Sequence, residues 1–373
     1  MRSPKVSDIV GIINKNFPFA LAEEWDNVGL QLGNPDTIVK RLMVALDPLS
    51  EVVENAVSSG CQLLVTHHPM IFKPMRQITS STVGGSLVLK AASSGLSVIS
   101  MHTNYDISSG GLNDILAERL GLSETVPLQV SGRFELAKLV VFVPESAMAE
   151  VRDVMFSFAE SVGNYSSCSF SARGEGTFLP LEGSVPAIGK VGLLEKVKEE
   201  RLEFLVRRDR IGSAVKALLK AHPYEEPAFD FYPLLNEGEP FGIGRLGKLP
   251  IPITLGRYAQ TVKTALEADH LRIIGDLSIK VEKVAICSGS GASMLRDAVR
   301  AGADLIVTGD MKYHDAREAQ ASGIAVIDAG HFATERIMVP AVSAFLQASA
   351  CSSGWELEIL QSNDEKEPFC IYT

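Results

Sequence analysis

The chain has 373 residues, of which 46% are hydrophobic and 21% charged, with a formal net charge of −10 at pH 7. This length predicts two or three domains, and the composition excludes an intrinsically disordered chain. The acidic balance argues against non-specific nucleic-acid binding, although it leaves room for a local basic pocket.

The cysteines and the first residues indicate the compartment. The five cysteines are scattered and form no CxxC pair: Cys61, Cys168, Cys287, Cys351 and Cys370. Such a pattern is typical of free thiols in a reducing compartment. The first residues, MRSPKVSDIVGIINKNF, lack the apolar run of a signal peptide, and no apolar stretch reaches the roughly 18 residues of a membrane helix. We therefore expect a soluble, cytoplasmic protein without a membrane partner.

The first third of the chain predicts alternating strands and helices. Apolar spacing indicates a helix over 4–15 with Ser7 as its N-cap, followed by strands over 41–49, 61–66 and 96–101. The segments between and after these strands predict helices over 50–60, 85–95 and 111–121. This order indicates a largely buried sheet covered by helices.

The middle third has a different pattern. A strand over 136–144 and a helix over 145–163 precede a Ser/Gly-rich hairpin-like stretch, and a helix over 211–222 and a strand over 228–234 follow it. The order β-α-β-β-α-β is that of a ferredoxin-like α+β domain. We predict that residues 131–245 form such a domain, inserted into the outer one.

The last third returns to the first pattern. It predicts a strand with a Gly-rich turn over 283–291, strands over 303–309, 324–330 and 355–360, and helices over 293–302, 314–323 and 332–350. The predicted fold is therefore a discontinuous outer α/β domain, with halves at 1–130 and 246–373, that carries an inserted α+β domain.

Five of the seven histidines follow predicted strands of the outer domain. The strand over 61–66 is followed by His67 and His68, and the strand over 96–101 by a segment that contains His102 and Asp106. The strand over 303–309 is followed by Asp310 and His314, and the strand over 324–330 by His331 and Glu335. Because the carboxyl ends of strands in an open α/β sheet share one edge, we expect these side chains to converge there.

The converging residues are typical metal ligands. Imidazole and carboxylate without thiolate favour zinc, iron, manganese or cobalt. The spacing of His331 and Glu335 places them on one helical face if the helix begins at His331. Five mixed ligands suit two open divalent metal ions roughly 3.5 Å apart better than one closed site. The predicted metal ligands are His67, His68, Asp106, His331 and Glu335. Taken singly, each also fits a hydrogen-bonded surface or core residue.

Other features allow more than one interpretation. His102, His314, Asp310 and Tyr105 are candidates for holding the metal ligands or for moving protons. In EEWDNVGLQLG (23–33), Trp25 is expected in the core, and Asp26 and Asn27 either orient a ligand or cap a turn. The turn CSGSGAS (287–293) has the backbone for a phosphate site but lacks the established phosphate-loop patterns. HPYEEP (222–227) is expected as a structured turn whose His and Glu side chains can also meet a cation.

Several motifs together resemble the GTP cyclohydrolase 1 type 2 homolog family. They are WDNVGLQLG (25–33), VTHHP (65–69), HTNYD (102–106), TGDMKYH (308–314) and GHFATE (330–335). The resemblance implies two metal ions held by the five positions named above, and a toroidal homohexamer. The stretch from GNYSSCSFSARGEGTF to HPYEEPAFDFYPL resembles the PII/CutA-like insert of the longer members.

These features favour a metal-dependent hydrolase that acts on a nucleotide or a related small molecule. The family name implies hydrolytic opening of the GTP imidazole ring, a reaction that suits a metal-bound hydroxide attacking C8, with His314 or His102 as catalytic residues that move protons. The alternative is a non-catalytic regulatory or metal-handling hexamer whose insert senses a ligand or a partner.

Overall fold

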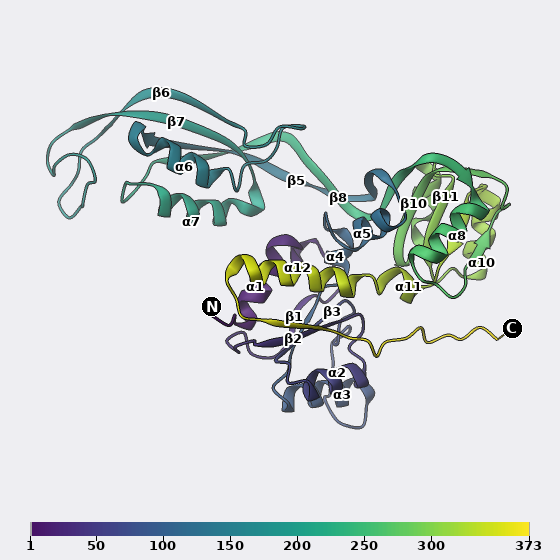
Figure 1. Ribbon diagram of the computed structural model, residues 1–373. Helices are drawn as coiled ribbons and strands as arrows, with labels where there is room; N and C mark the ends of the chain where they lie inside the picture. Colours follow the sequence, from purple (N-terminus) through teal and green to yellow (C-terminus); the bar gives the residue numbers. More distant parts are fainter. Residues whose placement is uncertain (1, 373) are drawn as a thin grey trace. The chain divides into compact units, whose positions relative to one another are not determined.

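A computed structural model describes residues 2–372 and divides the chain into two compact units (Figure 1). The outer unit combines the residues up to Ser131 with those from Phe241 onward, and the insert unit spans Gly132–Pro240. Two long strands carry the chain from one unit into the other, β5 (Ser123–Pro144) and β8 (Phe229–Thr254). Each unit has its own hydrophobic core.

The first half of the outer unit is built on a five-stranded sheet of order β1-β4-β3-β2-β13. Its strands are β1 (Gly29–Leu32), β2 (Arg41–Ala45), β3 (Leu63–Thr66), β4 (Ser97–Ser100) and β13 (Glu358–Gln361). All are parallel except β1, which runs antiparallel to β4. Every residue of β3 and β4 is buried because helices cover both faces of the sheet.

The helices around this sheet form two layers (Figure 1). One layer consists of α2 (Ser50–Ser58) and α3 (Val83–Ser93), which pack on alternate side chains of β2, β3 and β4. The other layer consists of α1 (Val6–Asn16) and α12 (Met338–Ser353), while α5 (Leu112–Arg119) packs against α12 and against the second sheet. The short helices η1 (Phe19–Leu21) and α4 (Thr103–Ile107) lie in the connecting segments.

The second half of the outer unit contains three parallel strands flanked by antiparallel ones. These are β10 (Lys280–Ser290), β11 (Leu305–Gly309) and β12 (Ala325–Asp328), bordered by the end of β8 and by β9 (Arg272–Ile274). The helices are α8 (Leu255–Ala265), η4 (Ala292–Met294), α9 (Leu295–Arg300), α10 (Tyr313–Ser322) and α11 (His331–Glu335). The largest core cluster contains side chains from both sheets, so the two halves share one core.

The insert unit is a sheet with two helices on one face. Strands β6 (Ser169–Phe178) and β7 (Glu195–Arg207) pair with β5 in the order β6-β7-β5-β8. Helices α6 (Met148–Met155) and α7 (Ile211–Ala221) pack on the side chains of Leu139, Val141 and Leu202. The short helices η2 (Glu145–Ala147) and η3 (Arg208–Arg210) precede them.

Several predicted elements differ from the observed ones. The helix expected over 332–350 is two helices, α11 and α12, separated at Arg336 and Ile337. Ser7 is not an N-cap, because α1 begins at Val6 after Lys5. Strands β5 and β8 extend far beyond 136–144 and 228–234.

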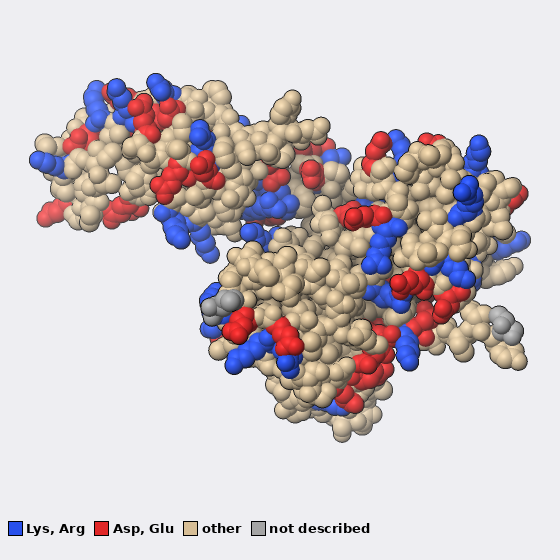
Figure 2. Space-filling model, viewed as in Figure 1, with Lys and Arg blue, Asp and Glu red and all other residues tan. Residues whose placement is uncertain are grey.

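Acidic and basic side chains are interspersed over the face of each unit shown in Figure 2. Among residues 2–372, no helix combines the length and the apolar character needed to cross a membrane.

Candidate metal centre

Short connections after parallel strands place the predicted ligands. His67 and His68 follow β3 directly. Asp106 lies on α4, which is separated from the end of β4 only by Met101 and His102. Helix α11 begins at His331, after Gly330 with its positive φ of 87°, so His331 and Glu335 stand one turn apart on the same face. Their side chains meet, with 2.9 Å between His331 Nε2 and Glu335 Oε2.

Glu335 lies at the middle of the cluster and is only 4% exposed. Its Oε2 is also 3.0 Å from His68 Nε2, and its Oε1 is 3.8 Å from His67 Nε2. His67 Nε2 is 3.8 Å from Asp106 Oδ1, while His68 Nε2 and His331 Nε2 are 3.3 Å apart. The structure thus brings together all five residues that the sequence singled out.

The other ring nitrogens of these histidines are held from outside the cluster. His67 Nδ1 lies 2.8 Å from the carbonyl oxygen of Met101, and a carbonyl can only accept, so this nitrogen carries the hydrogen. His68 Nδ1 donates in the same way to Asp47 at 2.7 Å, and His331 Nδ1 to Asp310 at 2.7 Å. Each neutral ring therefore turns an unprotonated Nε2 towards Glu335.

This arrangement fits a cation. Three nitrogen lone pairs and two carboxylates meet, and their short contacts become hydrogen bonds only when a ring is protonated. As long as the facing rings are neutral, His67 Nε2 and Glu335 Oε2 are buried without a hydrogen-bond partner, a costly state unless a proton or a metal cation satisfies them. The nitrogen and oxygen donor set suits a divalent transition metal, so the residues present fit the metal ions that the resemblance implies.

The pKa values show how strongly the cluster attracts positive charge. Burial opposes the charged form of His68, but hydrogen bonds to Asp47 and Glu335 raise its pKa to about 10. The hydrogen bond to Glu335 raises the pKa of His331 to about 9 against the opposing effect of burial. Burial acts to raise the pKa of Glu335, yet the surrounding imidazoles hold it well below its usual value. Without metal, protons therefore take the place of the cation.

Two overlapping groups of side chains have the geometry to hold metal ions. One consists of His68, His331 and Glu335, and the other of His67, His68 and His102. From the sequence, His102 was predicted to move protons. In the structure, the centroid of its ring lies 5.2 Å from the ring centroid of His67 and 5.6 Å from that of His68. His102 is thus part of the cluster itself, and its Nδ1 contacts Asp26 at 2.8 Å.

Other candidates lie elsewhere. His314 is exposed at the start of α10, where its ring contacts Tyr313, and it belongs to neither metal group among residues 2–372. Tyr105 is buried in the core against Phe17.

The expectation that Trp25 is a core residue is wrong, because it is 59% exposed and contacts His102 edge to face. Its ring lies beside the metal cluster because the neighbouring Asp26 is turned inward to His102 and Thr103.

Some residues that support the cluster were missed in the sequence. Asp47 follows β2, the parallel neighbour of β3, and this strand order was the signal that would have placed it beside His68. The last residues of β10 support both buried carboxylates. Ser288 Oγ lies 3.2 Å from Asp106 Oδ1, and a Cβ at Gly289 would lie 2.1 Å from Glu335 Oε1.

Known proteins resemble this chain over nearly its whole length. A Halalkalibacterium halodurans protein named GTP cyclohydrolase 1 type 2 homolog is 38% identical over 362 residues, 97% of each chain. The Bacillus subtilis protein of the same name is 37% identical over 369 residues, 99% of each chain. The crystal structure of a Bacillus cereus protein related to NIF3 matches the whole of both chains with a TM-score of 0.89 at 38% identity.

These similarities confirm the resemblance inferred from the motifs, and the mixed α/β fold with two sheets agrees with that of the solved relative. A family model described as Duf34/NIF3 (NGG1p interacting factor 3) matches residues 4–368. The chain belongs to the Duf34/NIF3 family.

Proposed function

We propose that the cluster is a dinuclear centre for zinc, iron, manganese or cobalt, held by His67, His68, Asp106, His331 and Glu335. The observation that carries the proposal is the position of Glu335. Its Oε2 faces His68 and His331, and its Oε1 faces His67, so one buried carboxylate contacts both sides of the cluster. A carboxylate between two cations is a recurrent feature of two-metal hydrolytic sites.

We further propose that the centre performs metal-dependent hydrolysis of a nucleotide or a related small molecule. When bound, divalent metal ions would polarise the substrate and make water acidic enough to supply hydroxide near neutral pH. The side chains of Asp106 and Glu335, 10% and 5% exposed, balance the positive charge in a site from which most water is excluded.

His102 is placed to accept and return a proton at Nε2. Although burial opposes it, the hydrogen bond from His102 holds the pKa of Asp26 at about 2, so this carboxylate stays ionised. Thr103 also donates to Asp26 through its backbone nitrogen at 3.0 Å. Asp26 therefore fixes the hydrogen on His102 Nδ1 and leaves Nε2 free, the arrangement that a general base requires. His314, the other sequence candidate, is proposed only as a proton carrier at the surface.

The substrate class follows from the name of the curated relatives, GTP cyclohydrolase 1 type 2 homolog. The direct test is an activity screen of metal-reconstituted protein against nucleotides, phosphoesters and cyclic amides. We expect turnover of at least one nucleotide, which Glu335→Gln abolishes and His102→Gln slows. If no member of the three classes is turned over, the catalytic proposal fails.

Three further features are proposed with the activity. We propose that the protein assembles as a homohexamer, that the insert is a PII/CutA-like domain, and that the protein is cytoplasmic. The β-α-β-β-α-β order of the insert unit supports the second. The free state of all five cysteines is compatible with a reducing compartment. Light scattering on the purified chain tests the hexamer, and a monomeric or dimeric mass would contradict it.

A non-catalytic regulatory role is the second candidate, and a large cavity in the insert unit favours it. In that case the metals would organise the assembly and the insert would bind the signal. Metal-loaded protein that binds a ligand at the insert yet turns over no substrate would support this candidate.

A further inference from the structure

The insert unit contains a cavity of about 840 Å³ that the proposed metal chemistry does not use. All its lining residues lie between 142 and 228, so it belongs to this unit alone. The volume is in the range of small-molecule sites, which are mostly apolar with a few placed polar groups.

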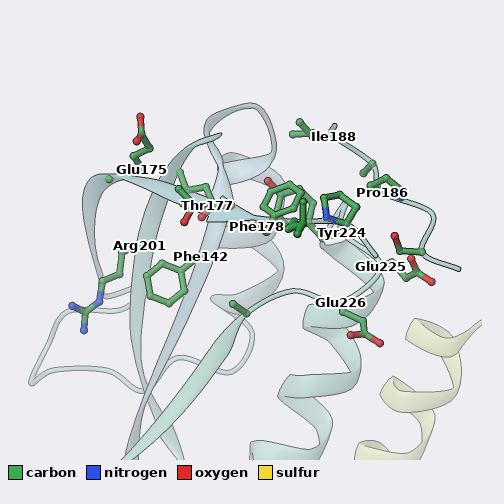
Figure 3. Close-up of a pocket in the computed structure, with 18 of the residues that line it drawn as sticks. Phe142, Glu175, Thr177, Phe178, Pro186, Ile188, Arg201, Tyr224, Glu225 and Glu226 are labelled. Atoms are coloured by element: carbon green, nitrogen blue, oxygen red, sulfur yellow. The ribbon is translucent and has the colours of Figure 1, made fainter. Parts of the chain in front are cut away.

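The cavity lies on the helix-free face of the insert sheet. Val141 and Val143 point to the helices, so Phe142 between them points to the other face. The strand register pairs Phe142 with Arg201 and Arg201 with Ala172, which places all three on that face. On β6 the residues of this face are Ala172, Gly174 and Gly176, and their small size hollows the sheet surface. The segment between β6 and β7 closes the opposite side, where Figure 3 shows Pro186 and Ile188.

Two aromatic rings stand in the cavity. Phe178 and Tyr224 meet edge to face with their ring centroids 5.7 Å apart, and Figure 3 shows them beside each other among the lining residues. The Tyr224 hydroxyl is buried near the Glu199 carboxylate, and burial together with its hydrogen-bond interaction with Glu199 raises the pKa of this phenol. A flat ligand ring can pack on these faces, and the neutral hydroxyl lies on the same side of the cavity as the Glu199 carboxylate.

The charge in the cavity is negative. Glu199 is only 9% exposed, and a Cβ at Gly176 would lie 2.1 Å from its Oε2, so the carboxylate occupies the space that this glycine leaves. No lysine or arginine among residues 2–372 pairs with Glu199. The two lining arginines pair elsewhere, Arg173 with Glu200 at 3.1 Å and Arg201 with Glu203 at 3.0 Å. A buried carboxylate without a cation is costly, and a ligand that brings one removes that cost.

We propose that this cavity binds a small planar aromatic molecule that carries a cationic N–H donor group, such as an amidinium, with the ring against Phe178 and Tyr224 and the donor on Glu199. An anionic ligand would meet the unpaired carboxylate and arginines that are already neutralised. A neutral one would leave Glu199 without a counter-charge. The carboxylate therefore selects for positive charge.

The test uses the full chain and three probes of nearly equal shape: benzamidine as the cation, benzamide as the neutral form and benzoate as the anion. Binding is measured by saturation-transfer NMR titration. Because a charge-assisted hydrogen bond contributes about 1.5–3 kcal/mol, benzamidine should bind at least about tenfold more tightly than either analogue.

Three variants locate the binding. Glu199→Gln keeps the size and removes the charge, and Gly174→Leu fills the hollow at a position where a new Cβ has no neighbour within 4 Å. Each of these two variants should bind benzamidine at least about tenfold more weakly than the wild type. Glu182→Gln is the control, because Glu182 lies on the segment between β6 and β7 but does not line the cavity, and it should leave benzamidine binding unchanged. Melting temperatures check folding, and Glu199→Gln should not lower the melting temperature because it removes an unpaired buried charge.

Several results would overturn the proposal. Absence of benzamidine binding in the millimolar range is one, and benzamidine binding that Glu199→Gln leaves unchanged is another. Benzoate binding that equals benzamidine binding and disappears in Gly174→Leu would show that the cavity prefers anions.

Discussion

Replacing Glu335 by glutamine should remove both metal ions together, because the two carboxylate oxygens face different histidines. Glu335 is 4% exposed, so water screens its charge poorly. With an effective dielectric constant of about 20, one pair of unit charges about 4 Å apart contributes roughly 4 kcal/mol, or close to a thousandfold in affinity. The new amide nitrogen can also donate to the Nε2 atoms of His68 and His331, which satisfies in the metal-free variant the lone pairs that otherwise need a cation.

The matched comparison is His67→Ala. His67 belongs to only one of the two metal groups, so its loss should deplete mainly one ion. Metal content by elemental analysis and site occupancy by anomalous scattering are measured for both variants and the wild type. If Glu335→Gln keeps two fully occupied ions while His67→Ala loses both, the bridge is assigned to the wrong residue, and Asp106 becomes the candidate.

Three further predictions concern pH, backbone and domain structure. Because the pKa of His68 is raised from 6.5 to about 10, its contribution to the stability of the metal-free protein is complete below pH 6.5 and is lost as the pH rises through about 10. The melting temperature of the chelated protein should therefore fall over this pH window while the affinity for metal rises. A melting temperature that does not change with pH would contradict the exchange of protons for metal. Gly289→Ala should lower the free energy of unfolding by about 1–2 kcal/mol because of the positive φ of 58° at this position, and it should also displace Glu335. Gly95→Ala is the control: with φ 71° and no neighbour within 4 Å, it should lower the free energy of unfolding by a similar amount but keep the metals. A chain of residues 130–245 should melt cooperatively, and the outer unit closed by a short linker should keep its metals. If the outer unit unfolds without the insert, the two units do not fold independently.

The outer α/β elements could be predicted because their patterns are local. Buried strands such as β3 and β4 are short apolar runs bounded by polar residues, and the helices after them begin and end close to the expected positions. The ligands followed from the same reasoning, since imidazoles and carboxylates after parallel strands converge whatever the details of packing.

Features that depend on tertiary contacts could not be predicted. In the long strands β5 and β8, the residues where the chain passes between the two units are mostly exposed, so no apolar pattern marks the full length of these strands. The break between α11 and α12 has no glycine or proline at Arg336 or Ile337 to indicate it. Trp25 was expected in the core, yet the turn that directs Asp26 to His102 leaves its ring exposed.

The role of the last residues of β10 also depended on the fold. As a sequence, CSGSGAS resembles a phosphate-binding turn. In the structure, Ser288 contacts Asp106, a residue 182 positions away, and Gly289 leaves the space that Glu335 occupies. No local pattern relates these segments, because they meet only when the two halves of the outer unit share one core.

The most direct test of the dinuclear centre is the metal content of the full chain after chelation and reconstitution, measured by elemental analysis against protein concentration. Five mixed ligands around a shared carboxylate predict about two divalent ions per chain. A content at or below about one per chain after saturation would be what a single mononuclear site gives, and it would contradict the account.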